Sequence, residues 1–316
     1  MHYKVRLLLP LFGILLAHAQ SGPTLLGSGF AAAPNSVALS PGLVMTFWIA
    51  GLNPIPGAPV QAPVPLPTEL SGISLTISQS TYGKDFPLPT LPVPVISIAQ
   101  TNNCNFPVPV QPTSTPLGCI MTGITVQVPY ELVVDPFTMP PYTALTVTQD
   151  GVPSPAFSIA TAHDIVHILT CNLAPCIARA DGSLLQTGPL PVAGDILTIY
   201  LVGLGTTTPS VPDGQLTPAP APTLNDGVFV DLVFGANAGP SVPVMNRPAG
   251  QQATVTFAGL SPGQIGLYQI NVQLPAAFPS IPACGVNGNL TVTTNLAINI
   301  GTAYYVYDGL SICVQP

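Results

Sequence analysis

Proline sets the strongest limit on what this chain can fold into. The sequence contains 40 prolines among 316 residues, and between them lie short runs rich in β-branched and aromatic residues. Such runs, bounded by Gly, Pro or Asn, are typical of β-strands. No long stretch shows helical periodicity with caps, so the sequence predicts an all-β protein. The clearest predicted strands are Leu43–Ala50, Gly72–Ser78, Leu145–Thr148, Leu197–Val202, Val228–Phe234 and Ala253–Ala258.

Two segments are especially rich in proline, Pro54–Pro67 and Pro87–Val95. Neither can be a central strand, because proline has no N–H to donate to a neighbouring strand. A polyproline-like segment can dock into an aromatic groove. Proline also blocks edge-to-edge pairing of sheets, and we favour this second role, with both segments as surface loops or edge segments.

The chain repeats itself. GLVMTFWIAGL from Gly42 aligns with GDILTIYLVGL from Gly194, ITVQVP from Ile124 with INVQLP from Ile270, and LTVT from Leu145 with LTVT from Leu290. Ordered matches at similar offsets indicate homologous units, each of a size suited to one β-sandwich. We predict two tandem immunoglobulin-like β-sandwich domains with proline-rich loops, at residues 20–160 and 191–316, joined by a linker at 161–190.

The first nineteen residues indicate export. A basic start at Lys4 and Arg6, an apolar run, and Ala17-His18-Ala19 form the pattern of a secretory signal peptide at residues 1–19. In an oxidising compartment, an even number of cysteines favours disulfides. Six cysteines allow fifteen pairings, and we hypothesise nearest-neighbour pairs. These are Cys104 with Cys119, Cys171 with Cys176, and Cys284 with Cys313.

One stretch, TAHDIVHILTCNLAPC from Thr161 to Cys176, contains the residue types of a tetrahedral zinc site. On a strand, His163 and His167 would point to the same side, which leaves a two-histidine metal site open. The two cysteines are better explained as a disulfide in an exported protein. We therefore expect a linker with a small Cys171–Cys176 loop and assign no metal or cofactor.

Charge is scarce: only 5% of residues are charged, against 47% hydrophobic, and the net charge is −7. We expect no nucleic-acid partner, because binding phosphates requires a basic patch. Recurring prolines in the charge-free stretches argue against a transmembrane segment. A surface with so few charges favours contact with other uncharged surfaces, including copies of itself.

Signs of catalysis are weak. The sequence has no G-x-S-x-G elbow and no H-E-x-x-H motif. A Ser-His-Asp triad could use His163 or His167 with Asp164, but no serine is marked as the partner. A carboxylate pair for glycoside hydrolysis could come from Glu69, Glu131, Asp135 or Asp231, at separations the sequence does not define. We expect no enzyme.

Five strings carry a family resemblance. They are Gly194–Pro218 (GDILTIYLVGLGTTTPSVPDGQLTP), Val255–Pro275 (VTFAGLSPGQIGLYQINVQLP), Leu66–Ile77 (LPTELSGISLTI), Ile124–Leu132 (ITVQVPYEL) and Ile177–Gln186 (IARADGSLLQ). The first two resemble the uncharacterised C-terminal domain found on many exported acidobacterial proteins, and the others are similar to the segments that precede it. The resemblance implies immunoglobulin-like modules at the cell exterior and brings no catalytic residues. HDIVHI, the cysteines and the proline runs depart from the family pattern.

These observations favour a secreted or cell-surface protein with a non-enzymatic structural or adhesive function. It would self-assemble as a homo-oligomer or polymer, such as a fibre or surface layer, through uncharged faces and strand edges. One alternative is a glycan-binding module that contacts a cell-surface protein or glycan. Its stacking faces would come from Trp48, Tyr142, Tyr268, Tyr304, Tyr305 and Tyr307, although Trp48 fits a core position better. The other alternative is a metal-dependent enzyme using His163 and His167.

Overall fold

The computed structural model describes residues 22–30, 36–80, 88–102, 120–134, 142–171, 173–243, 252–287 and 290–316. Within these ranges every regular element is a β-strand, and the strands pair in antiparallel sheets, which confirms the all-β prediction. The expected signal peptide at 1–19 and the expected pair Cys104 and Cys119 lie outside the described residues.

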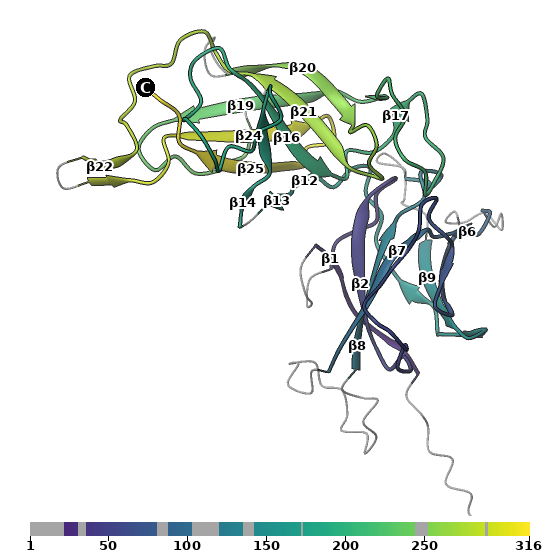
Figure 1. Cartoon of the computed structure of the whole chain (residues 1–316). Coiled ribbons are helices and arrows are strands. Elements are labelled where there is room, and N and C mark those ends of the chain that lie inside the picture. Colours follow the sequence, from purple (N-terminus) through teal and green to yellow (C-terminus); the bar gives the residue numbers. More distant parts are fainter. Residues whose placement is uncertain are drawn as a thin grey trace, which may run out of the picture.

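Two sheets form a first β-sandwich (Figure 1). One sheet has the order β1 (Thr24–Gly29), β2 (Val44–Ala50), β8 (Ile120–Gln127), β7 (Val95–Asn102) and β3 (Val60–Gln61). The other has the order β10 (Val152–Pro153), β9 (Tyr142–Gln149), β5 (Ile73–Ser80) and β4 (Glu69–Leu70), with β11 (Phe157–Ser158) beside β9 and β6 (Leu91–Pro92) beside β5. Their facing side chains share one hydrophobic core.

Strand alternation explains this core. In β2, Met45, Phe47 and Ile49 are buried, whereas Val44 and Trp48 are only partly buried. Successive side chains of a strand point to opposite faces of its sheet, so the first three residues face the core. The expectation that Trp48 lies in the core was wrong: Trp48 is on the outer face, where its ring lies against Gly123 of β8.

A ten-stranded sheet folds over to form a second sandwich. Its main order is β12 (His167–Ile168), β16 (Ile196–Val202), β21 (Tyr268–Gln273), β20 (Gln252–Leu260), β19 (Val228–Phe234), β24 (Leu296–Thr302) and β25 (Tyr307–Ile312). Beside it, β15 (Ile177–Arg179) pairs with β16, and β18 (Thr223–Leu224) joins β20 to β17 (Thr207–Thr208). Only two residue pairs link β19 to β20, and the two layers enclose a second core.

Both sandwiches have the same strand order. The first has β1-β2-β8-β7 facing β5-β9-β10, and the second has β12-β16-β21-β20 facing β19-β24-β25. The repeats beginning at Gly42 and Gly194 therefore fall on equivalent strands, as do those at Ile124 and Ile270. The LTVT match does not. Leu145 lies in β9, whose counterpart is β24, whereas Leu290 begins β23 (Leu290–Val292) in a separate hairpin.

The segment 161–190, which we expected to be a linker, contributes strands to the second sandwich. His167 and Ile168 pair with Val202 and Leu201, and β15 pairs with β16 over three residues. A surface linker would leave its backbone groups to water, whereas these groups complete a sheet edge. Without β12 and β15, the N–H and C=O groups on the outer edge of β16 would have no strand to pair with.

Short strands that contain proline, or that lie within a proline-rich segment, are found at sheet margins. β3 ends the first sheet and lies within the proline-rich segment 54–67, whereas β6 contains Pro92 and β10 contains Pro153. Each of these strands is only two residues long. A proline lacks the N–H that a further strand would bind, so these edges resist the addition of another chain.

Two hairpins stand apart from the large sheets, and a disulfide braces each one. Cys171–Cys176 spans the hairpin of β13 (Thr170–Cys171) and β14 (Ala174–Pro175). Cys284–Cys313 anchors the start of the hairpin of β22 (Gly285–Asn287) and β23. These are two of the three pairs that we hypothesised from the sequence. Within the described ranges, no helix is long and apolar enough to cross a membrane.

Candidate functional site

The two sandwiches meet at a bend (Figure 1), and several hydrogen bonds connect them there. We call this region the joint. Gly214 of the second sandwich donates its N–H to Oε1 of Gln127 at 2.7 Å, in a buried contact. The N–H of Tyr130 is donated to Oδ1 of Asp213 at 2.9 Å, and the N–H of Leu66 to the carbonyl of Gly214 at 2.9 Å. The joint is therefore held by hydrogen bonds to backbone atoms.

Glycines let the two backbones approach closely at the joint. A Cβ at Gly266, whose φ is +59°, would lie 2.6 Å from Val44 and 2.9 Å from the carbonyl oxygen of Gly42. A Cβ at Gly203, whose φ is +82°, would lie 2.9 Å from Cδ1 of Leu43 in the first sandwich and 1.9 Å from the carbonyl oxygen of Ile165. Positive φ already favours glycine at both positions, and the lack of space makes it necessary.

Two tyrosines and a carboxyl group lie in the joint, where Tyr130 and Asp213 are half-buried. Tyr268 is fully buried and donates its hydroxyl hydrogen to the carbonyl of Gly205. Burial raises the pKa of the neighbouring Tyr130 to about 12. Burial also raises the pKa of Asp213 to about 7, and the nearby carboxylate of Glu131 adds to this shift. The carboxyl group of Asp213 therefore keeps its proton to a higher pH than an ordinary aspartate does.

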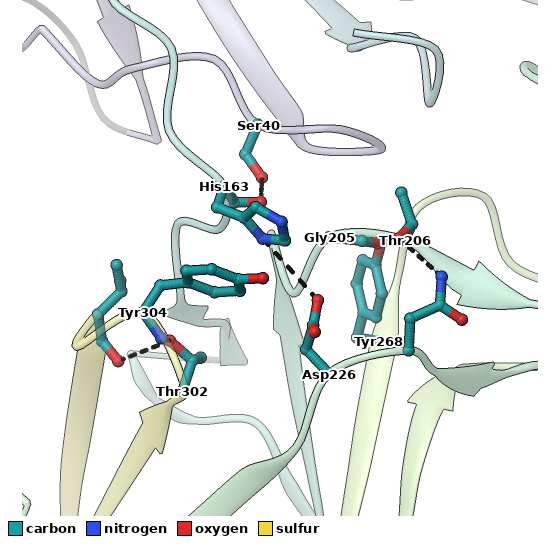
Figure 2. A network of polar contacts seen from close by, with 10 residues as sticks. Ser40, His163, Gly205, Thr206, Asp226, Tyr268, Thr302 and Tyr304 are labelled. Atoms are coloured by element: carbon teal, nitrogen blue, oxygen red, sulfur yellow. Dashed lines mark hydrogen bonds and ion pairs between the residues drawn. The ribbon is translucent and has the colours of Figure 1, made fainter. Parts of the chain in front are cut away.

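A second cluster surrounds His163 (Figure 2). The imidazole stacks on Tyr304 with ring centroids 3.6 Å apart, and its Nδ1 lies 3.9 Å from Oδ2 of Asp226. Ser40 donates its hydroxyl hydrogen to the carbonyl oxygen of His163 at 3.1 Å. Asp164, the next residue after His163, is buried. This desolvation raises the pKa of its carboxyl group, whereas a hydrogen bond with Thr302 acts to lower it. The cluster fastens the 161–168 segment to both sandwiches.

His167 occupies a different environment, beside a cleft between the sandwiches. Its ring stacks on Phe30 with centroids 3.9 Å apart, and its Nδ1 lies 3.7 Å from Oδ2 of Asp308. Desolvation lowers the pKa of His167, and the carboxylate of Asp308 opposes this effect. The cleft has a volume of about 440 Å³ and is bounded by β2 and β8 on one side and the 264–267 turn on the other.

The structure separates the residues that were considered as possible metal ligands. His163 and His167 bind different aspartates and stack on different rings, and Cys171 and Cys176 are bonded to each other. Across the described ranges, no three His, Cys, Asp or Glu side chains are grouped to hold a metal ion. The stretch that resembled a zinc site in sequence is a paired strand followed by a disulfide-bonded hairpin.

The candidate catalytic groups are also dispersed. His163 pairs with Asp226 rather than Asp164, and Ser40 contacts a backbone carbonyl and not the imidazole. Glu69 is exposed on β4, whereas Asp231 is buried in β19 of the other sandwich. Asp135 lies outside the described residues. Glu131 is exposed at the joint, beside Asp213.

The aromatic residues considered for glycan stacking differ in exposure. Tyr268 is fully buried and is not available to a ligand. Tyr304 is covered on one face by His163. Tyr142, Tyr305 and Tyr307 are exposed, at 58%, 86% and 48% respectively. Tyr305 lies in the turn between β24 and β25, and Tyr307 is the first residue of β25.

Sequence reasoning missed the joint, although a signal for it was present. The strings of the family resemblance contain its residues: Gln127 and Tyr130 in ITVQVPYEL, Asp213 and Gly214 in PDGQ, and Gly266 in GLYQ. The structure shows that these strings meet. No protein-family model matches the chain, and no curated protein sequence matches it.

Proposed function

We propose that this protein is an exported, non-enzymatic structural or adhesive component, built from two immunoglobulin-like sandwiches held in a fixed bend. The observation that carries the proposal is the buried hydrogen bond from the Gly214 N–H to Gln127, between residues 87 positions apart. The shared strand order supports the immunoglobulin-like assignment, because immunoglobulin folds place four strands opposite three in this sequence of pairing.

The use of polar groups supports a structural role. Gln127 and Asp213 bind backbone N–H groups, and the hydroxyl of Tyr268 binds a backbone carbonyl. Arg179 is the one lysine or arginine within the described ranges, and its guanidinium binds the carbonyls of Leu184 and Thr187. A catalytic or ligand-binding group is free to face a cleft, whereas these groups maintain the shape of the chain.

The surface supports adhesion through apolar side chains. Leu173 is fully exposed at the β13–β14 hairpin, Val286 is 79% exposed and Val152 is 71% exposed. Apolar groups presented in this way favour association. Because proline-containing strands lie at several sheet edges, we propose contacts through these projecting side chains in place of added strands.

Sedimentation velocity tests the proposal on the exported protein over a range of concentrations and salt. We expect oligomers that grow with concentration and persist at high salt, because apolar contacts are not screened by ions. A chain that remains monomeric at every concentration contradicts self-assembly.

One observation favours glycan binding as a second candidate. Tyr305 and Tyr307 are exposed on the same turn, and aromatic faces of this kind stack on sugar rings. Binding to a polysaccharide array that is lost in Tyr305→Ala and Tyr307→Ala, and retained in Tyr142→Ala, supports this candidate. Equal retention by all three variants contradicts it.

A further inference from the structure

The outer face of β2 leads directly into the cleft beside His167. Val44, Thr46 and Trp48 alternate with the core residues of this strand, so they share the face directed away from the core. Val44 and Thr46 line the cleft, and Trp48 lies two residues beyond Thr46, a distance of about 7 Å along a strand. The cleft holds about 440 Å³, within the range of roughly 300–1,000 Å³ that is usual for small-ligand sites. Trp48 therefore adjoins a cavity of the size that binds small ligands.

The indole of Trp48 lies flat on the sheet. A Cβ at Gly123 would lie 2.6 Å from Cζ3 of the indole, 3.0 Å from Cη2 and 3.1 Å from Cε3. Three neighbouring ring atoms at such similar distances mean that the ring lies face-on over this glycine. On the other side of Trp48, the paired residue of β1 is also a glycine, Gly27. Trp48 is only partly buried, and the ring face opposite Gly123 is directed away from the sheet, as in an aromatic platform for a planar or ring-shaped ligand.

The cleft adds hydrogen-bonding groups. The hydroxyls of Thr46 and Thr125 lie 2.9 Å apart, and either can be the donor. A hydroxyl has one hydrogen and two acceptor lone pairs, so this pair keeps one hydrogen and several lone pairs for a ligand. From the second sandwich, the exposed side chains of Thr170 and Gln264 supply a further hydroxyl and an amide. Half-buried apolar side chains, among them Phe30, complete the lining.

We propose that the cleft and the adjoining Trp48 bind a neutral oligosaccharide. A sugar ring has apolar C–H faces and hydroxyl edges, so it can stack on an indole while its hydroxyls bind threonine and glutamine side chains. No Lys or Arg lines the cleft, so an anionic sugar would gain no ion pair there. The spacing between Trp48 and the cleft favours a ligand of more than one ring. This inference goes beyond the proposed structural role, and its site is distinct from Tyr305 and Tyr307.

The chain contains a single tryptophan, Trp48, so tryptophan fluorescence reports on this site alone. We would titrate the exported protein with four neutral hexamers, cellohexaose, xylohexaose, mannohexaose and maltohexaose, and with the anionic hexagalacturonate. At least one neutral hexamer should change the emission saturably. It should bind roughly tenfold or more tightly than its own monosaccharide, and more tightly than hexagalacturonate. If no neutral hexamer changes the emission, the proposal is wrong.

Two variants test the cleft while Trp48 still reports. Thr125→Val keeps the shape of a half-buried side chain, and Gln264→Ala changes an exposed one. We expect each to weaken binding roughly three- to tenfold, the loss of one hydrogen bond. Thr198→Val is the matched control, because Thr198 is the equivalent of Thr46 in the repeat and likewise donates across the sheet, to Oδ1 of Asn271 at 3.1 Å. It should bind as the wild type does, and an equal loss in all three variants contradicts the assignment.

Trp48→Ala lacks the fluorophore, so calorimetry measures its binding, which we expect to be mostly lost. A sugar that binds by calorimetry without changing Trp48 emission, and whose binding is lost in Tyr305→Ala, places the site on the turn between β24 and β25. That result overturns this inference and supports the second candidate function. A chain that binds a neutral hexamer at Trp48 but stays monomeric at every concentration keeps this inference and contradicts only self-assembly.

Discussion

Asp213 accepts a hydrogen bond from the N–H of Tyr130 at 2.9 Å, although the two residues belong to different sandwiches. This contact places a half-buried carboxyl group beside the carboxylate of Glu131, with a pKa of about 7 for Asp213. We therefore expect the stability of the joint to depend on pH.

We expect Asp213 to make the fold less stable as pH rises. Its folded-state pKa, about 7, lies above the ordinary value of 3.8. The folded chain thus holds the proton more strongly than the unfolded chain, so the contribution to stability is complete below pH 4 and is lost as pH rises to 7. Asp213→Asn keeps the acceptor oxygen but cannot titrate. Thermal unfolding at pH 4.5 and 7.5 should show a smaller decrease for Asp213→Asn than for the wild type. Equal decreases contradict the assignment.

Gly203→Ala should open the joint, because its Cβ would lie 2.9 Å from Cδ1 of Leu43 in the first sandwich and would also overlap the carbonyl oxygen of Ile165. Gly194→Ala is a close control, since its φ of +84° matches the +82° of Gly203 while nothing lies within 4 Å of the added Cβ. Both variants bear the backbone strain, but only the first has the clash. Small-angle scattering should show a changed overall dimension for Gly203→Ala alone. The same scattering profile for both variants rules out a steric role for Gly203.

Tyr268→Phe should cost about 1–3 kcal/mol of unfolding free energy, because it leaves the carbonyl of Gly205 buried without this donor. Tyr305→Phe removes a hydroxyl from a side chain that is 86% exposed and should have almost no effect. Urea unfolding compares the two variants. A loss no larger for Tyr268→Phe than for Tyr305→Phe means that the buried hydrogen bond adds nothing.

Arg179→Lys should loosen the 183–189 loop while leaving the sheets intact. One guanidinium nitrogen donates to the carbonyls of Leu184 and Thr187, each at 2.8 Å, and a lysine ammonium lacks the planar fork that reaches several carbonyls. Hydrogen exchange should rise in this loop, with β16 and β21 unchanged as the internal reference. Unchanged exchange in the loop shows that Arg179 does not hold it.

The two disulfides should differ in their contribution to stability. Cys284–Cys313 closes a segment with a separation of 29 residues, whereas Cys171–Cys176 has a separation of 5. Chain-entropy arithmetic gives about 3–4 kcal/mol for the first and about 2 kcal/mol for the second. Urea unfolding of the paired Cys→Ser variants measures both. The reverse ranking contradicts this account.

The strand predictions were correct where one face of the strand is buried and the other is not. LVMTFWIA and LTIYLV alternate between core and outer positions, and both became long strands in the sandwiches. The LTVT match failed because four residues with β propensity also suit a short hairpin, and only the pairing of β19 with β24 identifies the equivalent strand. Local composition predicts a strand but not its neighbour.

The joint could not be predicted from local patterns. Its contacts join Gln127 to Gly214 and Tyr130 to Asp213, more than eighty positions apart, and one partner in each is a backbone N–H that every residue except proline carries. The surroundings of the histidines depend on distant residues in the same way. Spacing alone left a two-histidine metal site open as an alternative, whereas the folded chain places each histidine beside its own aspartate.

The attachment of the 161–168 segment limits how this protein could be divided. Leu39 exchanges backbone hydrogen bonds with Ala160 and Ala162, which adds the start of the segment to the first sandwich. Ile165 binds Gly203, and His167 and Ile168 extend the second. A cut before Thr161 removes an edge from one half, and a cut after Ile168 removes an edge from the other. The two halves are therefore not interchangeable modules, and recombination between such chains would have to exchange them together.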